Sequence, residues 1–287
     1  PTVVAQLIEL LSKKKNEFIE PGVIKFQVSK EPVAIVNPLN SLLSYFLQFQ
    51  NIDNFKHLLQ QNQSELVNFT DISLRSIVLG SQVKAGFWIR NGSSVSRQAT
   101  AYFDSLMTEY AFMRDFHLNQ IAILFEDQEK VLMNFLERWE LRSWFKNEVD
   151  FDKTIYEERF FSIVERFIAF AYNLFVDRSM FINETPEDAT LRKLNHAIGY
   201  ALCEEAMAFS ELHQYIDTNI ASSSKFEDVL YEVADYQPPS ALTDSGLYRL
   251  KESTYEKLDP LNILVDPGKF QIISEMVVKN SSKQKKR

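Results

Sequence analysis

The chain has 287 residues, which is enough for one large or two ordinary domains, and 45% of them are hydrophobic. With 23 Phe and only 7 Gly, the composition favours buried helices over a loop-rich β architecture. The formal net charge of -8 opposes general binding to nucleic acid, and a single cysteine excludes an internal disulfide and a cysteine-rich zinc site.

The ends of the chain and its apolar runs indicate whether it carries a signal peptide or a membrane span. No signal peptide is visible, and the longest strongly apolar run, 167–176, is only about half as long as the roughly 20 residues of a membrane span. We therefore expect this run in a core and no membrane partner. The absent initiator methionine and an abrupt basic end suggest a piece of a longer protein. That end is expected to be solvated, and its charged residues are Lys283, Lys285, Lys286 and Arg287.

Apolar spacing predicts a row of helices in the first part of the chain, without an internal repeat of fixed period. The first helix is expected over 3–18, and the alternating stretch 23–28 fits a short strand. Residues 71–91 predict a further helix. Asp71 is its expected cap, and Gly92 is expected in its stop signal.

The row continues with helices around 115–125 and 129–145, and the longest helix is expected over 155–179. The apolar stripe of this last helix consists of Phe160, Ile163, Val164, Phe167, Ala171 and Leu174. Because Phe167 lies in the middle of the stripe, its replacement by alanine is expected to be strongly destabilising. Together these helices predict an irregular helical bundle over 1–180, which we expect to act as a scaffold.

A polar stretch with a proline, 181–190, is the best candidate for a domain boundary. After it, apolar spacing predicts helices at 191–203, 210–216 and 224–235. The second of these helices is expected to begin with Ser210 as its cap.

Two prolines and a polar turn follow the third helix, and a short strand then places Tyr248 and Leu250 on one face. Three helices followed by a hairpin are typical of a winged-helix domain, which we predict over 191–260 with a small β wing. Residues 261–287 are expected to be a linker and a basic tail. The predicted fold class is therefore mainly α.

The charge on the third helix bears on its partners. Its acids are Glu227, Asp228, Glu232 and Asp235, against a single lysine, Lys225. A helix that reads a DNA groove needs arginine, lysine or amide side chains, so we predict no DNA binding. The four acids are candidate protein-contact residues. They form either a solvated face or a face that docks on a basic surface.

Three tryptophans are candidate interface anchors. Trp88 and Trp139 are expected in the core of a chain this rich in phenylalanine. Trp144 lies near the end of its helix beside Lys146 and Glu148, and it therefore joins the four acids as the fifth residue of the predicted protein-contact set.

The sequence predicts no catalytic, cofactor-binding or metal-binding residue. Cys203 and His196 are seven residues apart on one predicted helix and could form half of a metal site. A buried thiol and a partly buried imidazole are the favoured interpretation, and the apolar neighbours of Cys203 oppose a nucleophilic role. No glycine-rich phosphate loop and no paired acid and base support an enzyme of another type.

Four blocks in collinear order carry a resemblance to a known family: 71–92, 114–145, 201–216 and 233–251. Over roughly 71–260 they resemble the middle region of the large UBR-box E3 ubiquitin ligases, the N-recognins of the N-degron pathway, and the fungal members most closely. In that family the region is a helical scaffold with a winged-helix domain. It lies between a zinc-bound degron-reading box and an E2-binding helix with a RING.

The resemblance implies that the full-length protein is a RING-type E3 ubiquitin-protein transferase. Such a ligase transfers ubiquitin from a bound E2 to substrate lysines, for proteasomal degradation in the cytoplasm or also the nucleus. The implied partners are an E2 enzyme and degron-bearing substrates or an adaptor protein. One Cys and four His cannot form either zinc module, so zinc is implied only for the UBR box and RING of the full-length protein.

The sequence departs from the family at Ala206-Met207, where relatives tend to have a Pro-Met pair. This departure leaves open whether the chain belongs to a degron-reading member or to a diverged paralogue that works through an adaptor. An alternative from another class is a winged-helix protein that binds nucleic acid or an adaptor and has no ligase role.

Overall fold

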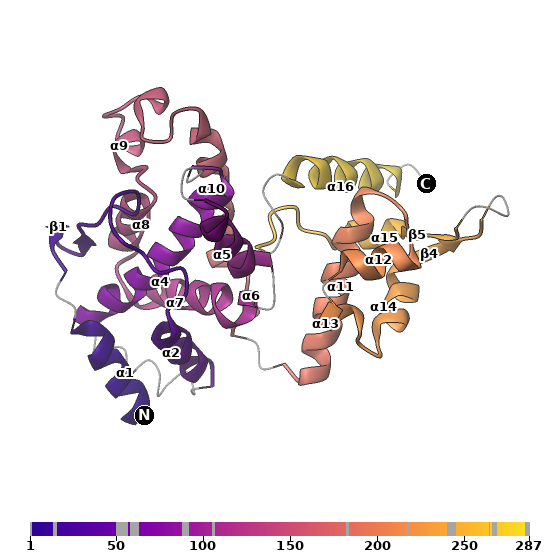
Figure 1. Ribbon diagram of the computed structural model, residues 1–287, viewed down its shortest axis with the longest axis horizontal. Coiled ribbons are helices and arrows are strands. Elements are labelled where there is room, and N and C mark those ends of the chain that lie inside the picture. Colours follow the sequence, from indigo (N-terminus) through magenta and orange to yellow (C-terminus); the bar gives the residue numbers. More distant parts are fainter. Residues whose placement is uncertain are drawn as a thin grey trace. The chain divides into compact units, whose positions relative to one another are not determined.

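The computed structural model in Figure 1 describes residues 2–13, 16–49, 57, 63–87, 92–104, 107–181, 184–216, 218–239, 245–263, 265 and 269–284. Helices dominate these residues, which confirms the predicted mainly α class. The chain divides into two compact units, Pro1–Phe181 and Ile182–Arg287, called here the first and the second unit.

The first unit consists of helices and one small hairpin near its start. Its elements are α1 Thr2–Ser12, β1 Phe18–Glu20, β2 Val23–Ile24, α2 Pro38–Gln48, α4 Gln63–Lys84, α5 Gly92–Asp104, α6 Met107–Tyr110, α7 Phe112–Phe125, α8 Gln128–Arg138, α9 Arg142–Phe145, η2 Phe151–Lys153, η3 Glu157–Arg159 and α10 Phe160–Val176. Helices α4 and α7 pack against each other, α1, α5 and α8 pack on α4, and α2 packs on α7.

Helix α4 begins earlier than predicted. The sequence placed a cap at Asp71 and a stop at Gly92, whereas α4 begins at Gln63 and Gly92 opens α5. Asp71 lies inside α4, where it is 2% exposed. Its carboxylate accepts hydrogen bonds of 2.6 Å from Nε of Arg75 and from Nε of Arg138. An aspartate inside a helix is tolerable here because Arg138 pairs with it. Arg138 is 67 residues away in the sequence, so the residues around Asp71 alone suggested a helix cap.

Arg138 also attaches β2 and the residues that follow it to the helices. Its side chain is fully buried, and it donates hydrogen bonds to the carbonyls of Ile24 and Phe26. The Arg75 guanidinium lies 3.7 Å from the centroid of the Phe26 ring. We call Asp71, Arg75 and Arg138 the ion cluster, because charge-assisted hydrogen bonds join them to one another and to a distant backbone segment.

Helix α10 is shorter than the predicted 155–179. The 3-10 turns η2 and η3 come before it, and Glu157 has a positive φ of 48°, which interrupts a regular helix. In the predicted stripe Phe167 is only half-buried, whereas Phe170, outside that stripe, is 6% exposed. The stripe residues that are buried as expected are Phe160, Ile163 and Leu174.

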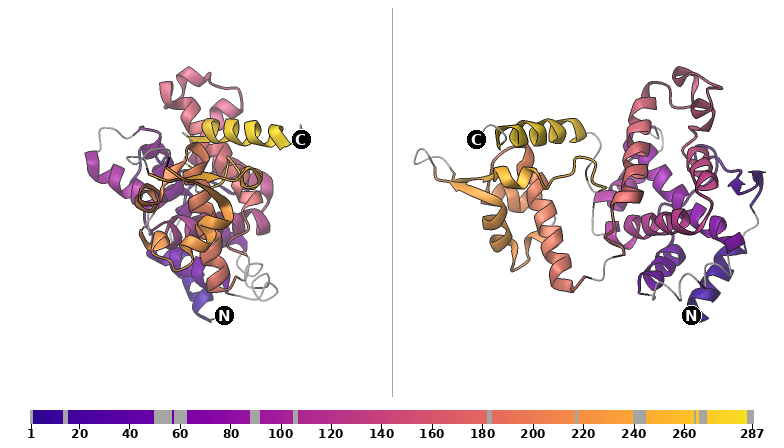
Figure 2. Two further views of the ribbon diagram at one scale, coloured as in Figure 1. Left: turned by 90° about the vertical axis from the view of Figure 1, so that its right-hand side faces the viewer. Right: turned by 180° about the vertical axis from the view of Figure 1, so that it is seen from behind.

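The second unit has the element order of a winged helix. Its elements are α11 Pro186–Glu204, β3 Met207–Ala208, α12 Phe209–Tyr215, α13 Thr218–Ala221, α14 Phe226–Val233, β4 Ala234–Gln237, β5 Leu247–Leu250, α15 Glu252–Tyr255 and α16 Phe270–Gln284. The predicted wing is the antiparallel hairpin of β4 and β5, which projects from the unit in Figures 1 and 2. The short β3 completes an antiparallel sheet in the order β3-β5-β4.

Two helix starts differ from the prediction. Helix α11 takes in part of the polar stretch 181–190, because Thr185 Oγ1 accepts a hydrogen bond of 3.1 Å from the amide of Asp188 and Pro186 is the first helical residue. Helix α12 begins at Phe209, so Ser210 is not its cap. The Glu211 carboxylate instead accepts from the amide of Ala208 at 3.0 Å.

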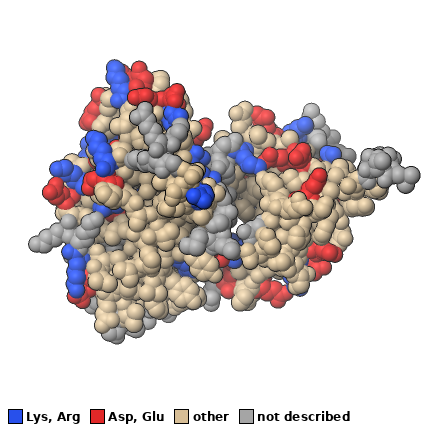
Figure 3. Space-filling view, viewed as in Figure 1, with Lys and Arg blue, Asp and Glu red and all other residues tan. Residues whose placement is uncertain are grey.

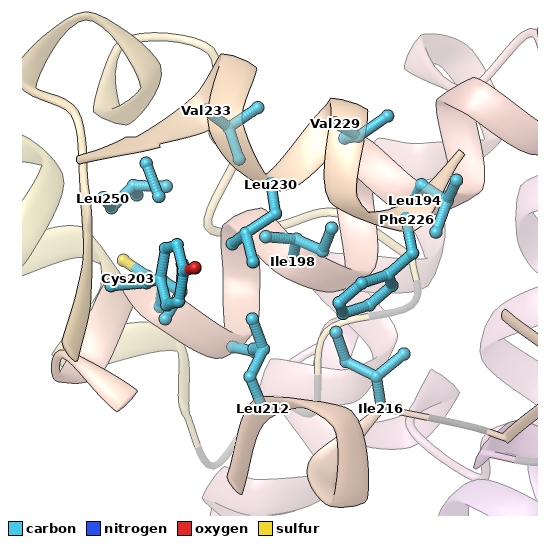
Figure 4. Close-up of a cluster of buried hydrophobic side chains, with 14 of the residues drawn as sticks. Leu194, Ile198, Cys203, Leu212, Ile216, Phe226, Val229, Leu230, Val233 and Leu250 are labelled. Carbon is cyan, nitrogen blue, oxygen red and sulfur yellow. The ribbon is translucent and has the colours of Figure 1, made fainter. Parts of the chain in front are cut away.

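The core of the second unit lies between α11, α12, α14 and the sheet. In Figure 4, Leu194 and Ile198 of α11, Leu212 of α12, and Phe226 and Leu230 of α14 point toward one another. Helix α16 adds Ile273, which is 1% exposed, to the same core. The prediction of a linker and basic tail over 261–287 was therefore wrong for α16, whose apolar residues have helical spacing that the adjoining polar and basic residues obscured.

Candidate protein-contact surfaces

Helix α14 has one buried and one exposed face. Its buried residues are Phe226, Val229, Leu230 and Val233. Glu227, Asp228 and Glu232 are exposed on the opposite face, as predicted, and none of them forms an ion pair with another described residue. Acidic side chains are visible in Figure 3 over the part of the second unit where Figure 1 shows α14.

Asp235 does not belong to the same face. Helix α14 ends at Val233, and Asp235 lies in β4 directly opposite Arg249 of β5. Residues directly opposite in an antiparallel pair extend to the same side of the sheet, so a cation lies beside this carboxylate. The structure therefore brings three of the four predicted acids together and places the fourth in another environment.

Tyrosines, which the sequence analysis did not single out, lie beside these acids. The ring centroid of Tyr248 is 6.1 Å from that of Tyr231 and 5.3 Å from that of Tyr236. Burial, a hydrogen bond with Tyr231 and the charges of Tyr231, Tyr236 and Glu227 raise the pKa of Tyr248 to about 12. The signal in the sequence was the spacing of Glu227 and Tyr231, which are one helical turn apart.

Lys251 is a cation at the C-terminal end of α14. Its ammonium donates hydrogen bonds of 2.7 Å to the carbonyls of Tyr231 and Glu232. These are carbonyls that the helix itself leaves without partners, and a cation is favourable at this end of the helix dipole. Lys251 is thus engaged with the backbone of α14.

Trp144 lies in the first unit, on the short helix α9. It is half-buried, and its ring packs edge-on against Phe160 with centroids 5.0 Å apart. Phe145 and Phe161, at 51% and 62% exposure, are more open to solvent than this tryptophan. Trp139 is fully buried, which confirms the core prediction for it, and Trp88 lies outside the described residues.

Helix α10 has a second apolar face that the sequence analysis did not separate from the buried one. It consists of Phe161, Ile168, Tyr172 and Phe175, which recur at helical spacing and are between 37% and 65% exposed. The sequence analysis assigned one apolar stripe to this helix, and these further apolar residues at helical spacing were the signal that it did not use.

Cys203 and His196 lie in surroundings that suit a structural role rather than a catalytic one. Cys203 is 1% exposed, as expected, and burial together with the Glu204 charge raises the pKa of its thiol to about 11. His196 Nε2 is 2.9 Å from Oδ1 of Asn262. Within the described ranges, no group of three or more His, Cys, Asp or Glu side chains could hold a metal ion. The same ranges contain no helix with the length and apolarity needed to cross a membrane.

Two family models match the chain. One is described as a UBR1/2/3-like ARM repeat domain and matches residues 6–170, and the other is described as the winged-helix domain of E3 ubiquitin-protein ligase UBR1-like proteins and matches residues 193–287. E3 ubiquitin-protein ligase UBR1 of Saccharomyces cerevisiae is 36% identical over 267 residues, which is 92% of this chain and 14% of that protein. The chain belongs to the UBR1-like family of E3 ubiquitin-protein ligases.

Two further UBR1-like relatives also match most of the chain. E3 ubiquitin-protein ligase ubr1 of Schizosaccharomyces pombe is 27% identical over 91% of the chain, and UBR1 of Homo sapiens is 26% identical over 80% of it. In both comparisons the chain spans 13% of the relative's own length. The resemblance and the winged-helix fold that we predicted are thus confirmed, and the family model adds an ARM-repeat description to the helices of the first unit.

The first unit of this UBR1-like chain contains a buried carboxyl group, Asp115. It is 1% exposed and accepts a hydrogen bond of 2.7 Å from the Tyr102 hydroxyl. Burial raises the pKa of Asp115 to about 8, although the Tyr102 and Ser73 hydroxyls oppose this rise. The carboxyl is therefore mostly protonated in the folded protein at neutral pH, whereas an unfolded aspartate titrates near a pKa of about 3.9.

Stability is expected to depend on this group. The pKa of Asp115 is higher in the folded than in the unfolded protein. The contribution of this carboxyl to stability is therefore fully present below about pH 4 and is lost as the pH rises through about 8. Asp115→Asn keeps an acceptor for Tyr102 but cannot ionise, so the variant should gain stability relative to wild type between these limits. Urea unfolding followed by tryptophan fluorescence measures this, since all three tryptophans lie in the first unit.

The difference in stability between wild type and Asp115→Asn, followed against pH, reports the titration of Asp115 alone. His117, whose pKa burial lowers to about 3, is present in both and cancels. If the stability difference between wild type and Asp115→Asn does not change with pH, the carboxyl is not buried as described.

Proposed function

We propose that this chain is the central scaffold of a RING-type E3 ubiquitin ligase of the N-degron pathway. The observation that carries the proposal is the match over 92% of the chain, at 36% identity, to a relative named E3 ubiquitin-protein ligase UBR1. Because the chain spans 14% of that relative, the ligase activity, the E2 and the substrates belong to the full-length protein.

In this proposal the chain positions other parts and does no chemistry itself. Ubiquitin passes from the E2 to a substrate lysine, and the zinc-bound degron-reading box and RING lie outside this chain. The only cysteine is buried with a raised thiol pKa, whereas a thioester-forming ligase needs an accessible thiolate. Support for the scaffold role comes from the two compact units, each with its own buried core.

A single-turnover discharge assay tests the scaffold role. The isolated chain is expected to leave the rate of E2~ubiquitin discharge at the value of the E2 alone, while the full-length ligase accelerates it. Transfer to a reporter should also depend on the reporter's N-terminal residue. Acceleration by the isolated chain would contradict a scaffold role, and indifference to the N-terminal residue would contradict the N-degron assignment.

We also propose that the exposed acids of α14 contact a basic surface of another protein. Like charges one turn apart on a helix repel one another by about 0.2–0.5 kcal/mol per pair, and a basic partner relieves this. Glu227→Lys with Asp228→Lys in the full-length ligase should reduce ubiquitination several-fold, and low salt should make the difference larger.

The matched control for this prediction is Glu275→Lys, an exposed charge reversal on α16. Circular dichroism should show the same helix content for both proteins. Normal ubiquitination by the doubly reversed ligase at low salt would mean that the acids of α14 are only solvated.

A further inference from the structure

Two exposed tyrosine rings of the second unit rest on a buried one. Tyr231 of α14 and Tyr236 of β4 are 55% and 54% exposed, and Tyr248 of β5, which touches both, is 7% exposed. Tyr236 and Tyr248 are directly opposite in the β4–β5 ladder. The buried ring therefore supports the two outer rings, which together form one aromatic surface.

Tyr236 packs against the backbone of the wing. A Cβ atom on Gly246 would collide with the Tyr236 hydroxyl oxygen, so the tyrosine ring lies directly against the Gly246 backbone. In the sheet order β3-β5-β4, β4 is an edge strand, and no other strand in the described part of the chain covers its outer side. The ring thus contacts Gly246 and Tyr248 on one side and is open to solvent on the other.

Carboxylates adjoin this aromatic surface. Glu227 lies one turn before Tyr231 on α14, and its charge acts on the supporting Tyr248. Asp228 and Glu232 form the next row of the same exposed face. We call Glu227, Asp228, Tyr231, Glu232 and Tyr236 the tyrosine–acid surface.

The chemistry of this surface selects its occupant. An apolar partner would cover the rings but would strip water from the three carboxylates without pairing them. A nucleic acid backbone would be repelled. A lysine or arginine side chain suits both components, since a cation is attracted to the face of an aromatic ring and forms charge-assisted hydrogen bonds with carboxylates.

We propose that the tyrosine–acid surface binds a lysine- or arginine-bearing peptide segment of a partner protein. The cations of this segment lie over Tyr231 and Tyr236 and pair with Glu227, Asp228 and Glu232. The inference rests on the contact role proposed above for α14, and it adds the chemical class of the partner and the two tyrosines as determinants of binding.

Fluorescence anisotropy with a labelled peptide of alternating arginine and serine tests this inference on the 287-residue chain. Binding is expected for this peptide and not for the same peptide with glutamine in place of arginine. Tyr231→Leu should weaken binding about 2-fold to 5-fold, whereas Tyr231→Phe, which keeps the ring, should not. Glu227→Gln with Asp228→Gln should weaken binding and reduce its dependence on salt.

Matched controls come from the same unit. Tyr215 is 56% exposed but lies near Lys269, so Tyr215→Leu should leave binding unchanged, and so should Glu275→Gln on α16. Equal affinity of wild type, Tyr231→Leu and Tyr236→Leu would overturn the inference, as would equal binding of the arginine and glutamine peptides.

The full-length ligase distinguishes the source of the occupant. The peptide should bind it as it binds the chain. If the full-length ligase excludes the peptide, a segment of the ligase itself occupies the surface, and the assignment to a partner protein is wrong. None of these outcomes depends on ubiquitin transfer, so failure of the peptide assay would leave the scaffold proposal standing.

Discussion

Asp71→Asn is expected to lower the free energy of unfolding of the first unit by about 3–5 kcal/mol. Asp71 is the carboxylate of the ion cluster and accepts from both Arg75 and Arg138. Burial lowers the pKa of Arg75, and the charge of Asp71 opposes that effect. The substitution keeps the size of the side chain but leaves two buried guanidinium groups without a counterion.

Urea unfolding followed by tryptophan fluorescence measures this loss. The control is Asp150→Asn, which breaks the exposed ion pair of Asp150 with Lys153 at 2.8 Å and should leave the midpoint unchanged. If both substitutions change the midpoint equally, the ion cluster is solvated in the protein.

Phe170→Ala is the second substitution with a large expected effect, a loss of about 3–5 kcal/mol. The Phe170 ring packs against Phe116, Phe135 and Trp139, with centroid distances of 6.1, 5.4 and 5.9 Å. These partners come from α7, from α8 and from the residue that follows α8, so no single neighbour can move to fill the cavity. The measurement is the same fluorescence-detected unfolding.

Phe167→Ala is the matched control on the same helix. Phe167 was expected to be the central core residue of α10, but it is half-buried. Its ring meets that of Trp139 edge-on, with the ring centroids 5.7 Å apart. Its removal should cost roughly 1–2 kcal/mol, because less apolar surface leaves water at this position in the folded state. A larger loss for Phe167→Ala than for Phe170→Ala would mean that the two faces of α10 are assigned the wrong way round.

The winged helix could be predicted because its signals are local. Apolar spacing at Leu194 and Ile198 and the alternation of Tyr248 and Leu250 need no knowledge of distant residues. The interior position of Asp71 could not be predicted, since its partner Arg138 comes from a helix 67 residues later. The sequence of α4 alone fits a cap and an interior ion equally well.

The candidate surface was predicted only in part for a similar reason. The exposure of Glu227 and Glu232 follows from helical spacing, but the separation of Asp235 depends on where α14 ends. Ala234 adopts an extended conformation with φ -130° and ψ 153°, and the amide of Lys251 donates to the carbonyl of Val233. That contact arises from the sheet, and so does the register that places Tyr236 opposite Tyr248. Neither can be inferred from residue spacing.

The position of β5 between β3 and β4 has a mechanical consequence. Strand β3 connects α11 with α12, while β4 continues directly from α14. A force on the hairpin tip is therefore carried into all three helices, and β5 can leave only when both of its ladders shear together. The wing is attached to the helices at its base through β3 and β4, so the helical core of the second unit would resist a force applied to the wing.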